Sequence, residues 1–372
     1  MPNAYWSAYS RKLKVCVMSK DVPVFFIAGV QRSGTTLLSF LLGNHPDIHV
    51  GKNSVVLRLI TCINNYRDAL PRRGAESREE LLRWLLQNDY RGRLAALIDV
   101  DKLADHPDLR SLMAESLRRD LERNDAQIWG DKAPNLQHFI PELLHLFPRA
   151  KVLHIVRDGR AVAYSNHKRA GANLELSAQE WVNGNILGQW NRDIMGADHY
   201  QLVRYEDLVR EPEKTARELC AFLGLAFRPE MMDLARNELT QGKDAYVAQA
   251  FDVAKINQFR EALRAAQIQG VEKIQGPLLR ELGYELTQSY AEGTFRQLSV
   301  RRQIWLHQKN NLRQLFLRKR SRKEDWQKKE GNEPWSKRWR RWLVLLGYDF
   351  LSRKIYYSLY RDQKIKNKYF RK

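Results

Sequence analysis

The sequence has few cysteines, and the three that it has form no recognisable pair. Cys16, Cys62 and Cys220 are scattered over 372 residues, and none belongs to a C-x-x-C motif. An odd and scattered set argues against a disulfide framework and against a cysteine-rich zinc site. This usage favours a reducing, cytoplasmic setting.

Long apolar runs are also missing. No segment reaches the roughly 18 consecutive apolar residues of a transmembrane helix. The first twenty residues contain Arg11, Lys12 and Lys14 but no apolar stretch typical of a signal peptide. We therefore expect a chain that neither spans nor enters a membrane. Its composition, 44% hydrophobic and 28% charged, is ordinary for a globular enzyme.

Acidic residues are scarce at one end of the chain. Residues 287–372 hold 24 lysines and arginines against 7 carboxylates, a net charge of +17, whereas residues 1–286 carry only +3. The same segment contains five of the ten tryptophans. This change in composition predicts a lead-in at 1–21, a main domain at 22–286 and a basic, tryptophan-rich helical extension at 287–372.

Within the extension, apolar residues recur at helical spacing. Trp335, Trp339 and Trp342 are followed by Leu343 and Leu346, with basic residues between them. A basic helix with such a stripe is typical of an interfacial membrane helix, which would make the protein peripheral to a membrane. The stripe could equally pack on the main domain, or the segment 335–372 could bind an anionic polymer; nucleic acid is the least favoured partner.

Strand-like runs alternate with helical patterns in the main domain. This order indicates parallel strands joined by helical crossovers, and hence an α/β fold with a P-loop-like parallel sheet flanked by helices. A mostly helical insert is expected at 55–124. The other patterns predict strands at 22–30, 151–158 and 200–208, and helices at 134–147, 178–195 and 211–225.

The loop after the first strand lacks a lysine. "GVQRSGTT" fits the phosphate loop G-x-x-x-x-G-K-[ST] at Gly29, Gly34 and Thr36, but Thr35 stands in the lysine position. The lysine normally bridges β- and γ-phosphates, and magnesium accompanies it. The backbone of residues 33–36 can still hold one phosphate, and Arg32 supplies a positive charge. The loop therefore suits a 5′-phosphate bearing a further group; the alternative is a turn without a ligand.

A second basic motif follows the strand at 151–158. In "HIVRDGRAVAYSNHKR", Arg157 leaves the strand at its carboxyl end, and Ser165 and Arg169 share one face of the next helix. Two guanidinium groups and a hydroxyl form a phosphate clamp, which predicts a second phosphate on the same nucleotide. The alternatives are an ion pair between Arg157 and Asp158, or a Walker-B-like strand end in a nucleotide kinase.

These two motifs resemble those of a known family. "GVQRSGTTLL" is similar to the 5′-phosphosulfate loop of sulfotransferases, and "VRDGRAVAYS" to their 3′-phosphate motif. The likeness is greatest to tyrosylprotein sulfotransferases and their bacterial relatives, and it runs through "WGDKAPN" and "VRYEDLVREPEK" over about residues 22–286. It implies an enzyme that moves a sulfuryl group from 3′-phosphoadenosine 5′-phosphosulfate (PAPS) to an acceptor hydroxyl, without a required metal.

The resemblance also implies roles for particular residues. Arg32 would contact the 5′-phosphosulfate and Lys132 the transferring sulfuryl group, while Tyr205 would lie near the adenine. A loop at "KINQFREAL", with Lys255 or Arg260, would close over the nucleotide. The remaining matched residues are the backbone cradle Ser33, Gly34, Thr35 and Thr36 and the 3′-phosphate ligands Arg157, Ser165 and Arg169.

One position departs from the family pattern. Asn53 stands where tyrosylprotein sulfotransferases carry a glutamate that resembles the general base, and asparagine cannot accept a proton. A positioned base contributes roughly 10²–10⁴-fold in rate. Asp131 is the replacement we favour, although it could instead fix Lys132.

Other bases and other functions stay open. His45, His49 and His138 are weaker candidates for the base, because lone histidines are more often structural. A nucleotide kinase with an aberrant loop, or a non-catalytic nucleotide- or polyanion-binding protein, are the alternative functions. Among acceptors we favour a glycan or a lipid-linked saccharide over a protein tyrosine or a small alcohol.

Overall fold

The computed structural model describes residues 22–51, 97–98, 109–234, 251–291 and 293–321. Several predicted features lie outside these residues. They are the lead-in at 1–21, Asn53, most of the insert at 55–124 and the tail segment at 335–372.

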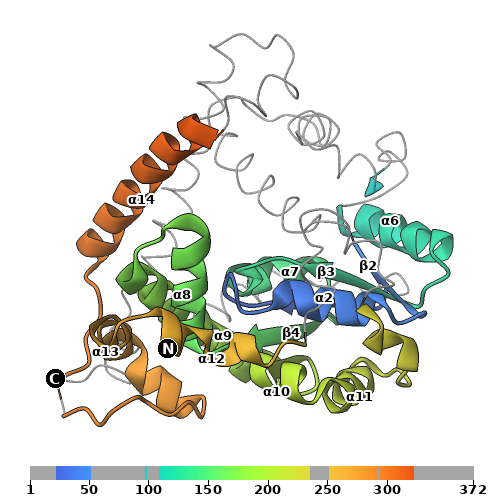
Figure 1. Cartoon of the computed structure of the whole chain (residues 1–372). Coiled ribbons are helices and arrows are strands. Elements are labelled where there is room, and N and C mark those ends of the chain that lie inside the picture. Colours follow the sequence, from blue (N-terminus) through green and yellow to red (C-terminus); the bar gives the residue numbers. More distant parts are fainter. Residues whose placement is uncertain (1–21, 52–96, 99–108, 235–250, 292, 322–372) are drawn as a thin grey trace, which may run out of the picture.

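The described part of the chain is built on one five-stranded parallel sheet (Figure 1). Its order is β2-β3-β1-β4-β5, and every neighbouring pair is parallel. The strands are β1 Val24–Ala28, β2 Ile48–Val50, β3 Ile128–Lys132, β4 Lys151–Val156 and β5 Tyr200–Arg204. This confirms the predicted α/β fold, a parallel sheet flanked by helices.

Helices connect the strands and cover both faces of the sheet (Figure 1). Short 3₁₀ helices occur at Leu136–Phe139 and Pro229–Met232. The α-helices are α2 Thr35–Gly43, α6 Leu109–Arg123, α7 Ile140–Leu146, α8 Gly159–Ala170, α9 Leu174–Met195, α10 Tyr205–Arg210, α11 Pro212–Leu223, α12 Ala254–Ala262, α13 Ala265–Glu281 and α14 Val300–Ser321. The helices expected at 134–147, 178–195 and 211–225 are therefore confirmed.

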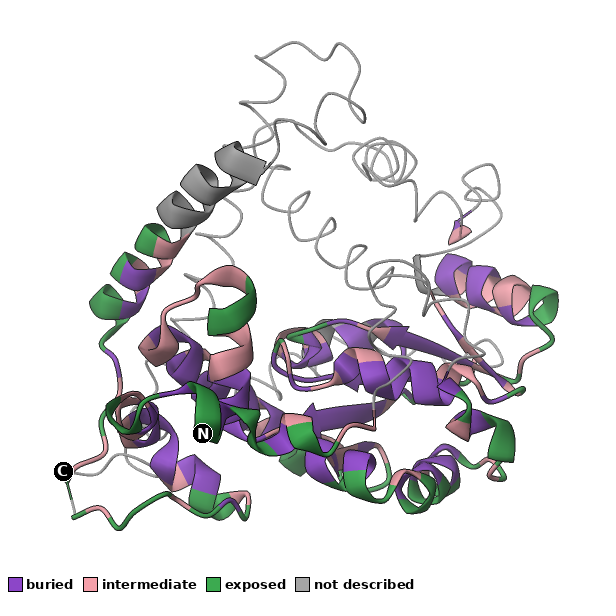
Figure 2. Cartoon of the chain, in the orientation of Figure 1, coloured by how far each residue is buried: buried purple, intermediate pink, exposed green. Residues whose placement is uncertain are grey.

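The central strand β1 contributes side chains to two hydrophobic cores, one on each face of the sheet. All five of its residues are buried, as expected of a strand covered on both faces (Figure 2). Phe26 belongs to the core that includes residues of α6 and α7, whereas Phe25 and Ile27 belong to the core that includes α2, α10 and α11. A third core joins α8, α9 and α13 beside the end of β4.

One predicted boundary is wrong. The strand expected at 200–208 ends at Arg204, because α10 begins at Tyr205. Glu206 and Asp207 occupy the first turn of α10, where carboxylates interact favourably with the positive end of the helix dipole. The β-like run "YQLVRY" hid this helix start.

The first part of the predicted extension packs on the main domain. Leu298 and Leu306 are buried in the third core, and the Leu298 N–H donates to Gln179 of α9 at 2.8 Å. Arg296 pairs with Glu175 at 2.7 Å. From this anchored start, α14 extends past α8 (Figure 1).

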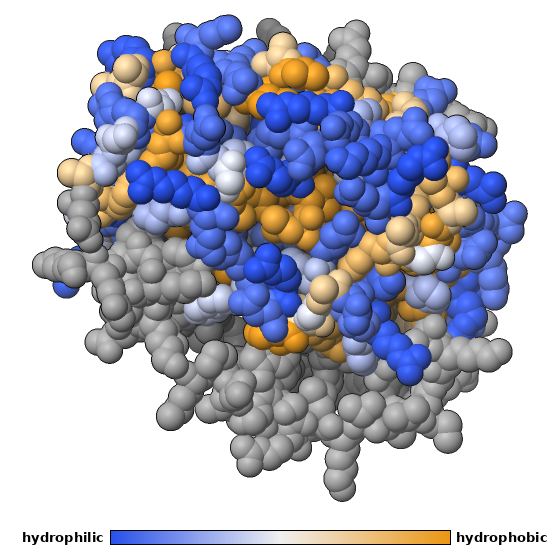
Figure 3. All heavy atoms as spheres, turned by 90° about the horizontal axis from the view of Figure 1, so that it is seen from below, coloured by the Kyte–Doolittle hydropathy of each residue, from blue (hydrophilic) through white to orange (hydrophobic). Residues whose placement is uncertain are grey.

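One face of the described residues is mostly polar. On the face seen from below, hydrophilic residues cover most of the coloured surface, and apolar residues show near its middle (Figure 3). Within the same residues, no helix combines the length and the apolar character required to cross a bilayer.

Candidate active site

Three strands end side by side where the sheet order reverses. Strand β1 lies between β3 and β4, and Ile27 is in register with Lys132 of β3 and with Leu153 of β4. The loop that follows β1, the end of β3 and Arg157 after β4 therefore meet at one edge of the sheet. This is the switch point at which open parallel sheets bind ligands.

The loop after β1 has the backbone of an anion cradle. Gly34 is the N-cap of α2, with φ 103° and no side-chain cap. A Cβ atom here would lie 2.5 Å from Cδ2 of Tyr205, so glycine is required sterically as well. The uncapped first turn leaves N–H groups of α2 for an anion. Arg32 also has a positive φ of 75°, a strained conformation of the kind that clusters at functional sites.

Two buried donors at this loop have no hydrogen-bond partner. Ser33 is completely buried and its Oγ is unpaired, and the Nε of Arg157 is unpaired as well. Buried polar groups are normally satisfied, so each exception needs an explanation. Phosphate oxygens supply the acceptors that these two groups lack, and the site therefore fits a phosphorylated ligand.

The structure brings Arg32, Arg157 and Ser165 together. The Arg32 Nε donates to Ser165 Oγ at 3.0 Å, and the Arg157 Nη1 donates weakly to the Arg32 carbonyl at 3.5 Å. These contacts join the phosphate loop to α8. Arg169 lies one turn beyond Ser165 on the same helix and is exposed.

The side chain of Arg157 is held on several sides. Its Nη2 donates to the Lys255 carbonyl at 2.7 Å, and its guanidinium carbon lies 4.2 Å from the centroid of the Tyr205 ring. The Trp181 indole donates to the Arg157 carbonyl at 2.9 Å. Burial raises the pKa of Tyr205, which keeps its hydroxyl neutral. The segment "KINQFREAL" thus reaches the site through the backbone of Lys255.

Lys132 and Asp131 face opposite sides of the sheet, as successive strand residues do. The Lys132 Nζ donates to Thr36 Oγ1 in the first turn of α2, at 3.3 Å. Asp131 is in register with Phe26 and is completely buried. Its Oδ1 accepts the N–H of Lys132 at 2.8 Å. The Lys132 side chain therefore lies beside the phosphate loop, whereas the Asp131 side chain lies on the other face of the sheet and bonds the Lys132 backbone.

The Walker-B alternative does not suit Asp158. This residue pairs with Arg160 at 2.7 Å, and its carboxylate also accepts the Arg160 N–H as the N-cap of α8. Both carboxylate oxygens are therefore engaged inside the protein. The ion pair considered between Arg157 and Asp158 is replaced by this pair with Arg160.

The three histidine candidates have structural partners or are partly buried. His45 contacts the Ala226 carbonyl at 2.8 Å, and His49 lies 3.2 Å from Asp120. Burial lowers the pKa of His138 to about 4. Within the described ranges, no group of three or more His, Cys, Asp or Glu residues is arranged to hold a metal ion.

The sequence pattern did not single out Glu206, Arg160 or Tyr284. Glu206 hydrogen-bonds the residue after Arg157, and Tyr284 hydrogen-bonds Glu206. The available signal was proximity in sequence, since Glu206 follows Tyr205 and Arg160 lies within the second basic motif.

The fold and the loop define a P-loop-like α/β protein with a nucleotide-type phosphate site. Residues 23–229 match the model of the sulfotransferase family, and the chain belongs to this family. That match starts at β1 and ends after α11, so it includes the predicted phosphate and adenine contacts but not the loop with Lys255 and Arg260.

Individual relatives differ in what their names say they act on. Protein-tyrosine sulfotransferase 1 of Danio rerio is 29% identical over 226 residues, which are 58% of this chain and 57% of that protein. Carbohydrate sulfotransferase 5 of Mus musculus is 30% identical over 188 residues, or 42% of this chain and 47% of that protein. The chain spans about half the length of the curated relatives it matches.

A solved structure similar to this chain is the sulfotransferase domain of the Synechococcus PCC 7002 olefin synthase. It is 24% identical with a TM-score of 0.49, over 73% of this chain and 98% of that domain.

Proposed function

We propose that the protein transfers a sulfuryl group from PAPS to a hydroxyl group of an acceptor. The observation that carries the proposal is the contact between Arg32 and Ser165, 3.0 Å long, which joins a lysine-free phosphate loop to a second basic cluster. PAPS has two phosphate positions and no triphosphate. A kinase loop would need the missing lysine, and Asp158 offers no carboxylate oxygen for magnesium.

The donor site would divide between two groups of residues. Arg32 and the backbone of residues 33–36 would hold the 5′-phosphosulfate, supported by the unpaired Ser33 Oγ. Arg157, Ser165 and Arg169 would hold the 3′-phosphate, since guanidinium groups match phosphate oxygens in a bidentate way. Tyr205 supports this second cluster through its ring.

The chemistry of transfer would depend on charge stabilisation. PAPS supplies a sulfuryl group attached to a phosphate that departs with negative charge. Arg32 and Lys132 would stabilise that charge, and preorganised cations in a partly buried site do so strongly. We propose that Asp131 positions Lys132, a role supported by its burial and by its bond to the Lys132 N–H.

The acceptor that we favour is a glycan or a lipid-linked saccharide. The carbohydrate sulfotransferase among the relatives supports this class, while the protein-tyrosine sulfotransferases support peptide tyrosine as the second candidate. Transfer of labelled sulfate from PAPS should be measured across saccharides, lipid-linked saccharides, tyrosine peptides and small alcohols. Lys132→Met is the matched inactive control. Label in peptide alone would reverse our preference, and binding of ATP–magnesium in place of PAPS would refute the donor.

We further propose a cytoplasmic protein that is peripheral to a membrane through residues 335–372. The three scattered cysteines, which form no C-x-x-C pair, support a reducing setting, and the net charge of +17 after residue 286 supports attraction to anionic lipid. Sedimentation with vesicles containing phosphatidylserine should deplete the full chain and leave a variant ending at residue 334 in solution. Equal partitioning of both would refute the membrane contact.

A further inference from the structure

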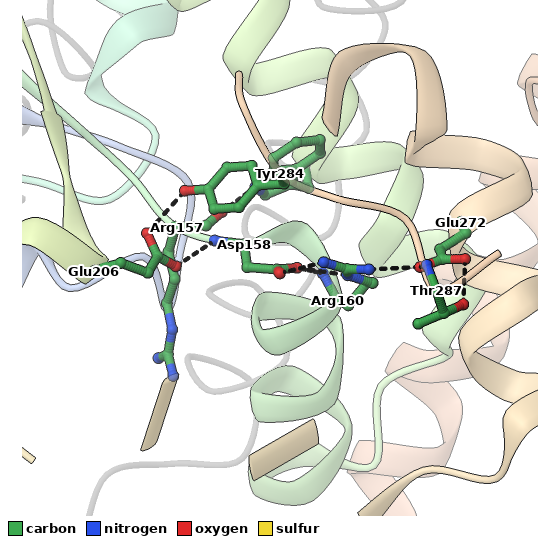
Figure 4. Close-up of polar contacts among 8 residues, drawn as sticks. Arg157, Asp158, Arg160, Glu206, Glu272, Tyr284 and Thr287 are labelled. Carbon is green, nitrogen blue, oxygen red and sulfur yellow. Dashed lines mark hydrogen bonds and ion pairs between the residues drawn. The ribbon is translucent and has the colours of Figure 1, made fainter. Parts of the chain in front are cut away.

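A series of polar contacts, buried except at Thr287, runs from beside Arg157 to the segment after α13 (Figure 4). It joins residues that are far apart in the sequence but contiguous in the fold. In order, the contacts are Tyr284–Glu206, Glu206–Asp158, Asp158–Arg160, Arg160–Glu272 and Glu272–Thr287.

Glu206 uses both oxygens of its carboxylate in this series. Its Oε1 accepts the backbone N–H of Asp158 at 2.9 Å, and its Oε2 accepts the hydroxyl of Tyr284 at 2.9 Å. The residue is only 3% exposed. A carboxylate this deeply buried is stable only with such partners, and here they include the residue that follows Arg157.

The bond between Glu206 and Asp158 lies just beyond the sheet. The last paired residues of β4 and β5 are Val156 and Arg204. Arg157 and Tyr205 are the residues that follow these two strands, and the Arg157 guanidinium carbon lies 4.2 Å from the centroid of the Tyr205 ring. The positions after them, Asp158 and Glu206, are joined by the hydrogen bond. The stacked pair is therefore enclosed between the end of the ladder and one buried hydrogen bond.

Tyr284 fixes the orientation of the Glu206 carboxylate from the far side. It follows α13, and its ring packs 4.5 Å from the guanidinium carbon of Arg204. Its hydroxyl donates to Glu206, so one tyrosine contacts the residues before and after Tyr205. Burial raises the pKa of Tyr284, which keeps this donor protonated.

We propose that Glu206 is a positioning residue for recognition of the 3′-phosphate, with Tyr284 as its supporting donor. The hydrogen bond from the Asp158 N–H to Glu206 fixes the backbone just after β4 relative to the backbone just after β5. The Arg157 guanidinium is thereby held against the Tyr205 ring and directed toward the ligand. The inference rests on the proposed function, in which Arg157 binds the 3′-phosphate. Neither residue touches the nucleotide in this role.

The test compares two nucleotides that differ only in the 3′-phosphate. Calorimetric affinities for adenosine 3′,5′-bisphosphate (PAP) and for 5′-AMP give a discrimination ratio for each variant. Glu206→Ala leaves a buried N–H unpaired and should weaken PAP binding by about tenfold or more, with 5′-AMP binding almost unchanged. Glu206→Gln keeps an acceptor oxygen for Asp158 and can donate to Tyr284, so it should restore the ratio.

Two further variants separate loss of the positioning role from a general loss of stability. Tyr284→Phe removes one hydroxyl and should lower the ratio by about threefold, since it loses one hydrogen bond of ordinary strength. Glu272→Gln changes a buried carboxylate that reaches Asp158 only through Arg160, and should lower the melting temperature without changing the ratio. Loss of PAP and 5′-AMP binding by the same factor in Glu206→Ala, or an unchanged ratio in both Glu206→Ala and Tyr284→Phe, would overturn the role. A wild-type protein that binds both nucleotides equally would refute the proposed function itself.

Discussion

The guanidinium carbon of Arg157 lies 4.2 Å from the centroid of the Tyr205 ring. The ring limits the orientation of the guanidinium plane, and the Lys255 carbonyl accepts a hydrogen bond from its Nη2 at 2.7 Å. The Nε is left without a partner. This stacking needs a planar cation, so lysine cannot replace arginine here.

The first prediction concerns Arg157. Arg157→Ala should weaken PAP binding by about ten- to hundredfold, the range expected when hydrogen bonds to a charged group are lost. Arg157→Lys keeps the charge but loses the stacked fork, and should recover only part of the affinity. The turnover number at saturating PAPS should change little, because the 3′-phosphate is remote from sulfur. The two measurements are PAP calorimetry and steady-state kinetics.

Arg32 should behave in the opposite way. Arg32→Gln should lower turnover by about 10²–10³-fold, the usual effect of removing one donor that stabilises transition-state charge. PAP affinity should fall less, because the backbone cradle remains. If the Arg32 and Arg157 variants lost turnover and affinity in equal proportion, the division between the two phosphate positions would be wrong.

The local signals in the sequence were strong where neighbours in the chain decide the structure. The phosphate loop and α8 follow buried strands directly, so Arg32, Arg157 and Ser165 could be placed at one edge of the sheet from pattern alone. Strand β3 was not among the predicted strands, so the separation of Asp131 from Lys132 came from the structure. The positions that could be inferred from the sequence are thus those that directly follow a predicted strand.

Contacts between distant residues were not predictable in this way. Glu206 and Asp158 are 48 residues apart, and Arg160 and Glu272 are 112 apart, so no periodicity relates them. The end of β5 at Arg204 was missed for a related reason. The β-like run "YQLVRY" continues into the first residue of α10, so the pattern gave no sign of the boundary.

Gly34 provides a third prediction. Gly34→Ala places a Cβ atom 2.5 Å from the Tyr205 ring at a φ of 103°, so it should cost about 2 kcal/mol or more in unfolding free energy and greatly weaken PAP binding. Gly224→Ala is the matched control. Its φ is 83°, but nothing lies within 4 Å of the new Cβ atom. It should cost about 1 kcal/mol and leave PAP affinity unchanged. Equal effects of the two variants on PAP affinity would contradict a cradle at Gly34.

The fourth prediction is a loss of stability in acid. Burial lowers the pKa of His154 to about 3, from 6.5 when it is exposed. The unfolded state therefore binds a proton that the folded state does not, and stability is full above pH 6.5 and declines as the pH falls toward 3. Between pH 7 and pH 5 this residue should cost about 2 kcal/mol.

His154→Gln is the variant that tests this dependence. It keeps an acceptor for the Tyr200 hydroxyl, which lies 2.9 Å from His154 Nδ1, but it does not titrate. Its unfolding free energy, measured by urea denaturation at both pH values, should fall less than that of the wild type. His138, whose pKa burial lowers to about 4, should account for part of the remaining decline. A wild-type slope identical to that of the variant would contradict the lowered pKa, because it would show that His154 takes up a proton as readily in the folded as in the unfolded state.

The last prediction separates the two roles considered for Asp131. Its side chain is completely buried and accepts the Lys132 N–H, so we expect it to orient Lys132 rather than to take a proton from the acceptor. Asp131→Asn should therefore lower turnover by less than about tenfold, below the 10²–10⁴-fold effect of a lost general base. The acidic limb of the pH–rate profile should stay in place.

Lys132→Met, by contrast, removes the cation beside Thr36 and should lower turnover by about 10²-fold or more. A hundredfold loss in Asp131→Asn together with the disappearance of that acidic limb would instead make Asp131 the base, because only a titrating group that acts in the transition state produces both effects.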